Sequence, residues 1–139
     1  MTKLNIKQGF LTGSLPVVRF SADRKANSFT LVEPVTYLTK RIGGGSRLYT
    51  IKVPAGFKTD LASIPRLLPL ALHRNPVAAA AIVHDWLYST KDMLNDLPRK
   101  KADLIFRDAM RDNGVGRLTA ATYYRFVRVF GWRYYNADA

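Results

Sequence analysis

The sequence predicts an α+β fold, in which a small antiparallel β-sheet or set of hairpins is followed by three to four helices. Two observations predict it. Up to about residue 58 the chain alternates β-branched or aromatic residues with polar ones, and turn residues interrupt the pattern. From 61 to 135 the apolar residues recur at helical spacing instead. Strands that precede the helices, rather than alternating with them, are typical of the α+β class.

The β-rich half, 1–58, contains the expected strands. They fall at 15–20 and within 28–53, where the strongest segments are Phe29–Val32, Thr36–Thr39 and Leu48–Val53. The three glycines at 43–45 separate the last two segments, which predicts a hairpin turn.

The helical half, 61–135, divides at Pro98 and at the glycines 114 and 116. Helices are expected near 64–73, 76–91, 99–113 and 117–134. No repeat or long linker interrupts the chain, so its 139 residues predict a single domain, 1–139. A domain of this size buries about two thirds of its unfolded surface, and it needs neither a metal nor a disulfide to fold.

Composition excludes several kinds of chemistry. The chain has no cysteine, which removes disulfides, thiol catalysis and thiolate zinc sites, and two histidines make any other zinc site poor. The first residues lack the apolar core of a secretion signal, and no apolar run is long enough to span a bilayer. We therefore expect neither a signal peptide nor a transmembrane segment.

One of the two histidines lies on an apolar, alanine-rich helix directly before a carboxylate. On the helix expected at 76–91, His84 and Tyr88 lie one turn apart on one face, and Asp85 points about 100° away. Asp103 shares a stripe of the next helix with other core residues, so we expect it to meet His84 across an antiparallel helix pair.

These residues suit the activation of water. A carboxylate that holds the Nδ1–H of an imidazole leaves Nε2 to take a proton from water. Asp85 would hold a hard cation that polarises an ester carbonyl. The pattern thus outlines an ester hydrolase without a covalent nucleophile. The alternative is a buried histidine that an aspartate and a tyrosine satisfy, without catalysis.

The pattern His84-Asp85-x-x-Tyr88, followed by Asp103 in the segment Ala102-Asp103-x-x-Phe106, resembles the catalytic helices of phospholipase A2 enzymes, above all the short, cysteine-poor bacterial and parvoviral ones. The resemblance implies that His84 is the general base and that Asp103 orients it. It also implies that Tyr88 supports the site with its hydroxyl and that Asp85 binds calcium.

The glycine-rich calcium loop of those enzymes has no counterpart directly before His84. Asp60 is the alternative source of a second calcium ligand. The other interpretation of Asp60 is a cap for the helix expected at 64–73.

A broader resemblance covers most of 30–135. The chain is similar to a small domain family of tailed bacteriophages and prophages that has no assigned biochemical function. Its signature runs through Val53–Arg66, His84–Tyr88, Ala102–Met110 and Phe130–Trp132. Membership implies a phage-encoded protein in the virion or the host cytoplasm, with other virion proteins of the tail or the head–tail junction as partners.

Charge is the remaining signal. Lysine and arginine number 22 against 10 acidic residues, a net charge of +12, which favours an anionic phospholipid surface or nucleic acid as partner. The last helix interleaves arginines with aromatic residues. We expect an interface for anions formed by Arg117, Arg125, Arg128, Trp132 and Arg133. The alternative is that Phe126, Val127 and Phe130 belong to the core and that the arginines form a solvated face.

Three functions follow from the sequence. The first is a phage lipid hydrolase of the phospholipase A2 type, with calcium as its cofactor. The second is a non-catalytic virion subunit in which the same residues form a structural network. The third is a basic protein that binds nucleic acid, which rests on charge alone because neither a nucleic-acid motif nor a phosphate loop is present.

Overall fold

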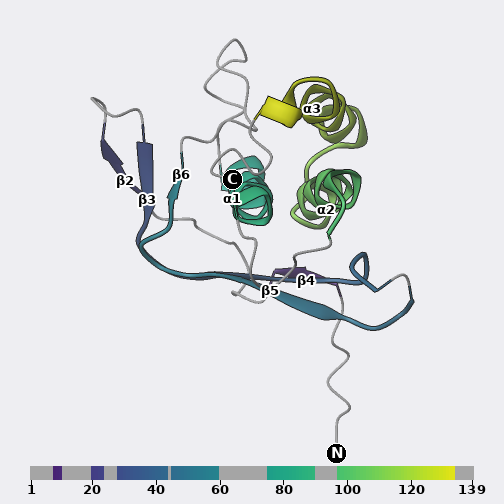
Figure 1. Ribbon diagram of the computed structural model, residues 1–139, viewed down its shortest axis with the longest axis horizontal. Helices are drawn as coiled ribbons and strands as arrows, with labels where there is room; N and C mark the ends of the chain where they lie inside the picture. The colour runs from purple at the N-terminus through teal and green to yellow at the C-terminus, as the bar shows by residue number, and fades with distance from the viewer. Residues whose placement is uncertain are drawn as a thin grey trace, which may run out of the picture.

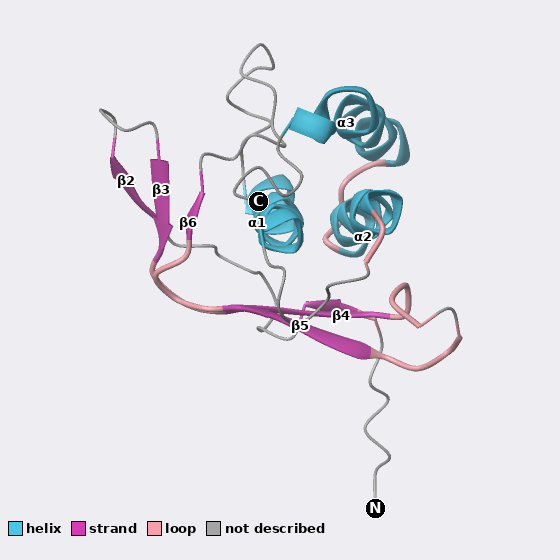
Figure 2. Ribbon diagram, viewed as in Figure 1, coloured by secondary structure: helices cyan, strands magenta, loops and turns pink. Residues whose placement is uncertain are grey.

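The computed structural model contains two small antiparallel sheets and a layer of three helices (Figures 1 and 2). It describes residues 8–10, 20–23, 28–43, 45–59, 75–89 and 97–133. Within these residues the strands precede the helices, which confirms the predicted α+β class. Residues 15–19, Asp60 and the helix expected at 64–73 lie outside the described part of the chain.

The first sheet has the order β1-β4-β5 and lies beneath the helices in the view of Figure 1. Its strands are β1 (Gly9–Phe10), β4 (Val35–Thr39) and β5 (Tyr49–Val53). Strand β5 alternates strictly, with Ile51 and Val53 buried and Lys52 exposed between them. One face of this sheet therefore belongs to the core.

The second sheet, β2-β3-β6, flanks α1 on the side opposite α2 (Figure 1). It consists of β2 (Phe20–Asp23), β3 (Ser28–Leu31) and β6 (Lys58–Thr59). The turn from β5 into β6 places Gly56 at φ 90°, a conformation that glycine adopts without strain. This turn delivers the end of β6 to helix α1.

The helices are α1 (Asn75–Ser89), α2 (Arg99–Asp112) and α3 (Arg117–Phe130), followed by a short 3₁₀ turn, η2 (Gly131–Arg133). Residues 77–84 of α1 are all buried, because the helix is surrounded by β4, β5 and α2. Small alanine side chains over 78–81 permit this close approach. Helix α2 packs between α1 and α3, so α3 is the outermost helix (Figure 1).

Helix α3 buries one face and leaves the opposite one exposed. Its buried residues are Ala120, Tyr123 and Val127. The expectation that Phe126 and Phe130 are also core residues holds in part only, since Phe126 is half-buried and Phe130 is 44% exposed. Both rings lie at the edge of the helix interface, with centroids 5.1 Å apart. Among the described helices none is long and apolar enough to cross a membrane.

Hydrogen bonds to two carboxylates of α2 hold this helix against the first sheet. The Tyr37 hydroxyl donates to Asp112 Oδ2 at 2.6 Å, and burial together with this carboxylate raises the pKa of Tyr37 above its usual value. Arg41 binds both oxygens of Asp108, at 2.5 and 3.1 Å. Such bidentate pairs fix direction as well as distance. Helix α2 therefore has a defined position over the sheet, and Asp103 on its inner face has a defined position against α1.

Candidate active site

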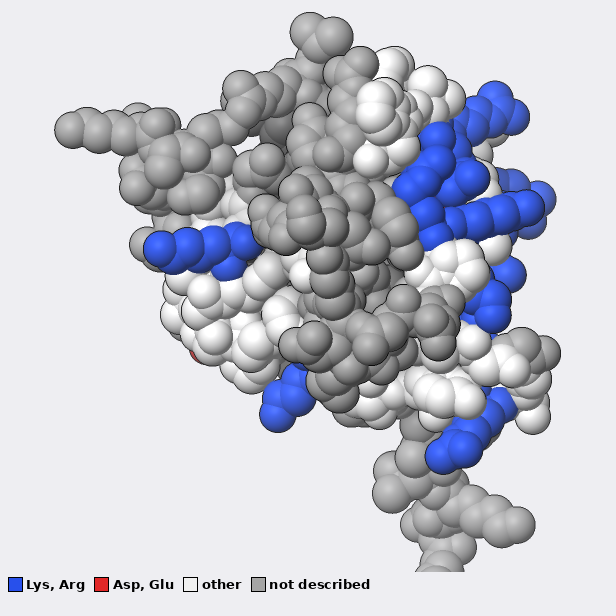
Figure 3. Space-filling model, viewed as in Figure 1, with Lys and Arg blue, Asp and Glu red and all other residues white. Residues whose placement is uncertain are grey.

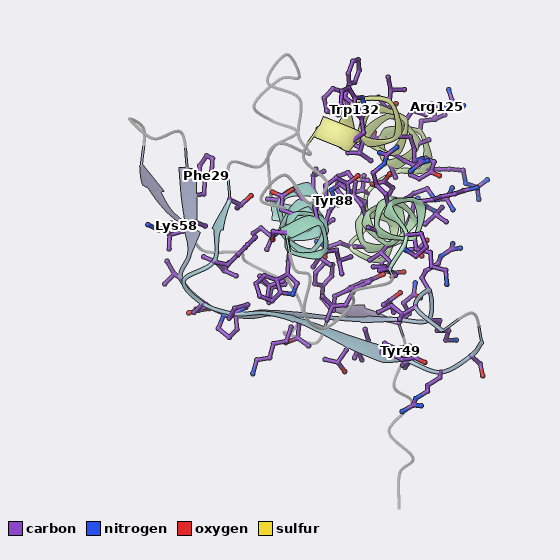
Figure 4. All side chains as sticks on the ribbon, in the orientation of Figure 1. Phe29, Tyr49, Lys58, Tyr88, Arg125 and Trp132 are labelled. Carbon is purple, nitrogen blue, oxygen red and sulfur yellow. The ribbon has the colours of Figure 1, made fainter. Side chains whose placement is uncertain are left out.

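The candidate site lies where α1 faces α2. His84 Nε2 is 2.7 Å from Asp103 Oδ1, and the Tyr88 hydroxyl donates a hydrogen bond to the same oxygen. His84 and Asp103 are 1% and 0% exposed. Figure 4 shows Tyr88 between the two helices. The structure thus brings together His84, Tyr88 and Asp103, as their helical spacing predicts.

The second oxygen of Asp103 faces α3. Arg128 donates to Asp103 Oδ2 at 2.7 Å, and Arg99, one turn before Asp103 on α2, reaches the same oxygen at 3.4 Å. Four side chains from three helices therefore donate to one buried carboxylate. A buried charge is tolerated only when it is paired and hydrogen-bonded in this way.

Arg99 also closes the end of α3. Its guanidinium donates to the carbonyl oxygens of Val127 at 3.0 Å and Arg128 at 3.2 Å. The Val127 carbonyl also accepts a hydrogen bond from the Gly131 N–H at the C-cap. A cation at a helix C-terminus adds donors to the last carbonyls and interacts favourably with the helix dipole. A basic residue at the start of α2 interacts unfavourably with the dipole of that helix. For Arg99 this is offset because its guanidinium binds the C-terminal carbonyls of α3.

Opposing effects set the acidity of Asp103. Burial alone would raise the pKa of Asp103, but the hydrogen bond and charge of His84, with hydrogen bonds from Tyr88 and Arg128, bring that pKa below its usual value. Burial also raises the pKa of the Tyr88 hydroxyl, and the bond to Asp103 raises it further. At neutral pH the site therefore holds a carboxylate anion and a neutral phenol.

The imidazole is fixed from both sides. Its ring stacks on Phe106, with centroids 4.7 Å apart and planes at 26°, and it contacts the Tyr88 ring at 4.1 Å. The expected orientation of the imidazole was wrong in one respect. Nε2, and not Nδ1, meets Asp103, because that nitrogen lies at the far end of the ring and reaches across to the next helix.

Asp85 points away from this pair, as its helical position predicts. Its Oδ2 accepts a hydrogen bond from the Thr59 hydroxyl at the end of β6. One residue on, Trp86 is half-buried, and its ring meets Phe57 edge-on at 5.2 Å. The segment before Asp60 and the helix that carries His84 are therefore joined by contacts from two successive helix residues.

The described residues do not complete a calcium site. Calcium takes six to eight oxygen ligands, whereas Asp85 and Thr59 offer one carboxylate and one hydroxyl that are bonded to each other. No group of three or more acidic or histidine side chains suited to a metal occurs in the described part of the chain. Asp60, the other expected ligand, lies outside it.

The residues expected to form an anion interface separate into two groups. Arg128 faces inward to Asp103, so its main contact is with the buried site. Arg117 and Arg125 are exposed, and Trp132 is 63% exposed. The side chain of Arg133 is not among those described.

Sequence reasoning missed three partners in the site. Thr59 binds Asp85, Arg99 binds Asp103, and Arg128 binds Asp103 from α3. The spacing of Arg99 and Asp103, four residues apart on one helix, is a signal that predicts an ion pair. The contacts of Thr59 and Arg128 depend on how elements distant in sequence pack together, so no local sequence pattern predicts them.

Fold and site together define a small α+β protein built around a buried histidine–aspartate–tyrosine network. The chain belongs to a family described as "Protein of unknown function (DUF1353)", whose model matches residues 29–127. The match begins in β3 and ends in α3, and it includes His84, Tyr88, Arg99 and Asp103. Neither the curated proteins nor the solved structures contain a match to the chain.

Proposed function

We propose that the protein is a phage-encoded lipid hydrolase that cleaves ester bonds by activating water, in the manner of the phospholipase A2 enzymes that its motifs resemble. The observation that carries the proposal is the single oxygen of Asp103 that binds both His84 Nε2 and the Tyr88 hydroxyl. A carboxylate fixed in this way holds an imidazole in one tautomer and stabilises the imidazolium that proton transfer creates.

The proposed reaction begins at His84. In it Nε2–H stays directed at Asp103, which it contacts at 2.7 Å, and Nδ1 takes a proton from water. The hydroxide equivalent adds to the ester carbonyl, the carbon–oxygen bond to the alcohol breaks, and the proton on Nδ1 passes to the leaving alkoxide. The products are a fatty acid and the alcohol, and His84 returns to its neutral form.

Calcium is the cofactor that the resemblance implies. Asp85 is the described side chain that would hold it, and the metal would supply a positive charge to the ester carbonyl. The steps assigned to His84, Asp103 and Tyr88 do not depend on it. Calcium dependence is therefore measured as a separate property of the reaction.

Fatty-acid release from mixed anionic and zwitterionic phospholipid vesicles tests the proposal. The full chain and His84→Gln are compared, each with and without millimolar calcium. Glutamine keeps an N–H that can reach Asp103 but cannot accept a proton, so the variant separates catalysis from support of the fold. We expect His84→Gln to lower release by about 10²- to 10⁴-fold while the variant stays folded, as its circular dichroism spectrum should show. Equal release by the two proteins, or none by the wild type, would refute the hydrolase.

A second function, a non-catalytic virion subunit, is favoured by one specific observation. His84 and Asp103 are 1% and 0% exposed. Arg99 and Arg128 both form ion pairs with the Asp103 carboxylate. Networks of this kind also perturb ionisable groups in proteins where they serve only to hold elements together. For this function we expect no lipid turnover, while substitutions at Asp103 impair folding and incorporation into the particle.

A further inference from the structure

Helix α3 carries an unusual exposed stripe on the side opposite its buried face. Leu118 is 84% exposed and Val129 is 59% exposed. At 100° per residue, Leu118 and Val129 lie within about 20° of each other around the helix axis. Arg125, also exposed, lies between them on the same line. We call Leu118, Arg125 and Val129 the outer stripe.

No described element covers the outer stripe. The main described packing partners of α3 are α2 and η2, and α2 takes the opposite face through residues such as Tyr123 and Val127. Figure 4 shows Arg125 on the side of α3 that points away from α2. Isolated exposed apolar residues are ordinary, but two that share one line with an exposed arginine on the outermost helix point to a contact surface.

Charge indicates what the surface contacts. Helix α3 contains three arginines and no acidic residue, and the chain has a net charge of +12. Figure 3 shows lysine and arginine gathered on the side of the molecule where α2 and α3 lie, with little acidic surface in view. A second copy of the chain would bring the same positive charge against the stripe, which disfavours self-association through it. The partner is therefore anionic.

The apolar members of the stripe distinguish between anionic partners. Leu118 and Val129 are aliphatic, and aliphatic groups gain free energy in the acyl region of a bilayer, whereas single-stranded nucleic acid is held mainly by aromatic stacking and by charge. The arginine between them suits the headgroup level, where it meets anionic phosphate. We propose that the outer stripe of α3 docks the protein on an anionic lipid surface. This binding does not depend on hydrolysis, so it stands or falls separately from the proposed function.

Vesicle sedimentation of the full chain tests the docking surface. The vesicles are phosphatidylcholine alone and phosphatidylcholine mixed with phosphatidylglycerol. We expect binding to the mixed vesicles, and the double variant Leu118→Gln with Val129→Gln should weaken it by about tenfold or more. Arg125→Gln should weaken it about fivefold, and only where phosphatidylglycerol is present.

Matched controls use equally exposed residues elsewhere. Val32, 52% exposed in the segment between β3 and β4, is changed to glutamine, and so is Lys58, exposed on β6. Neither Val32→Gln nor Lys58→Gln should alter binding as the stripe variants do. The circular dichroism spectra and melting temperatures of all variants should match those of the wild type, because the changed side chains are exposed.

Three outcomes would overturn the proposal. One is the absence of binding to the mixed vesicles. Another is equal weakening by the control and stripe variants, which would mean that net charge alone attracts the protein. The third is a stripe-dependent affinity for a single-stranded oligonucleotide without affinity for vesicles, which would assign the surface to nucleic acid.

Discussion

The backbone of Gly131 lies directly against the Tyr88 hydroxyl: a Cβ atom at position 131 would stand 2.7 Å from that oxygen. The same Cβ would lie 3.3 Å from Arg99 Nη1. Both neighbours are bonded within the site, Tyr88 to Asp103 and Arg99 to the carbonyls at the end of α3. The turn after α3 is therefore part of the wall of the candidate site.

We predict that Gly131→Ala lowers the free energy of unfolding by about 1 to 3 kcal/mol. The added methyl group must displace either the Tyr88 hydroxyl from Asp103 or the Arg99 guanidinium from α3. In a Tyr88→Phe background the crowded oxygen is gone, so the same substitution should cost less. A double-mutant cycle by urea denaturation measures this coupling.

The control is Gly45→Ala, where an added Cβ meets nothing within 4 Å. It should leave stability nearly unchanged. Additive effects of Gly131→Ala and Tyr88→Phe would show that the contact between the two residues does not constrain the site.

Local patterns predicted the parts of the fold that depend on neighbours in sequence. Alternation in 49–53 predicted strand β5, and the stripe of Asp103 and Phe106 predicted the inner face of α2. The meeting of His84 with Asp103 followed from two helices and one assumption, that they pack antiparallel. By contrast, the nitrogen of His84 that meets Asp103 depends on the rotamer and the distance between helices, which spacing does not define.

Arg125 and Arg128 show most clearly which contacts a sequence pattern cannot predict. The sequence places Arg125 and Arg128 on the same helix with similar neighbours, and both were expected at an anion interface. Positions three residues apart differ by about 60° around the helix axis, and this difference is enough for Arg128 to reach Asp103 while Arg125 stays exposed. Only the position of α2 against α3 decides which arginine meets the buried carboxylate.

A second prediction concerns acid stability. The folded pKa of Asp103 is lowered below its ordinary 3.8, so the folded state binds this proton less readily than the unfolded state. The resulting stabilisation is fully present above the unfolded pKa and is lost as the pH falls through the folded pKa. Asp103→Asn should therefore cost about 3 kcal/mol near neutral pH, and the difference from wild type should shrink on acidification below about pH 4.

Denaturant titrations across this pH range measure the effect. Asp112→Asn is the control, because Asp112 also accepts hydrogen bonds but is exposed. We expect Asp112→Asn to lower the free energy of unfolding less than Asp103→Asn does at neutral pH. A difference between wild type and Asp103→Asn that stays constant down to low pH would contradict the assignment. If Asp103→Asn does not fold, Arg128→Gln, which removes one donor to the carboxylate, is expected to reduce the same acid-dependent stability in part.

A third prediction uses two tyrosines with opposite environments. Tyr123 is 1% exposed, and its hydroxyl, alone among the buried polar side-chain atoms of the described residues, has no hydrogen-bond partner. Burial raises the pKa of this phenol above its usual value. A buried hydroxyl without a partner lost its hydrogen bonds to water on folding without replacing them. We therefore expect Tyr123→Phe to stabilise the protein by about 1 kcal/mol.

Tyr88→Phe is the matched control, because it removes the same atom from a buried tyrosine whose hydroxyl donates to Asp103. It should destabilise the protein by about 1.5 to 3 kcal/mol, the range for a hydrogen bond to a charged group. Thermal unfolding of the two variants should move the melting temperature in opposite directions. Destabilisation by Tyr123→Phe would mean that its hydroxyl has a partner in the folded protein. The ring would still pack on Phe106, at 6.4 Å between centroids, in either case, so packing does not account for a difference in sign.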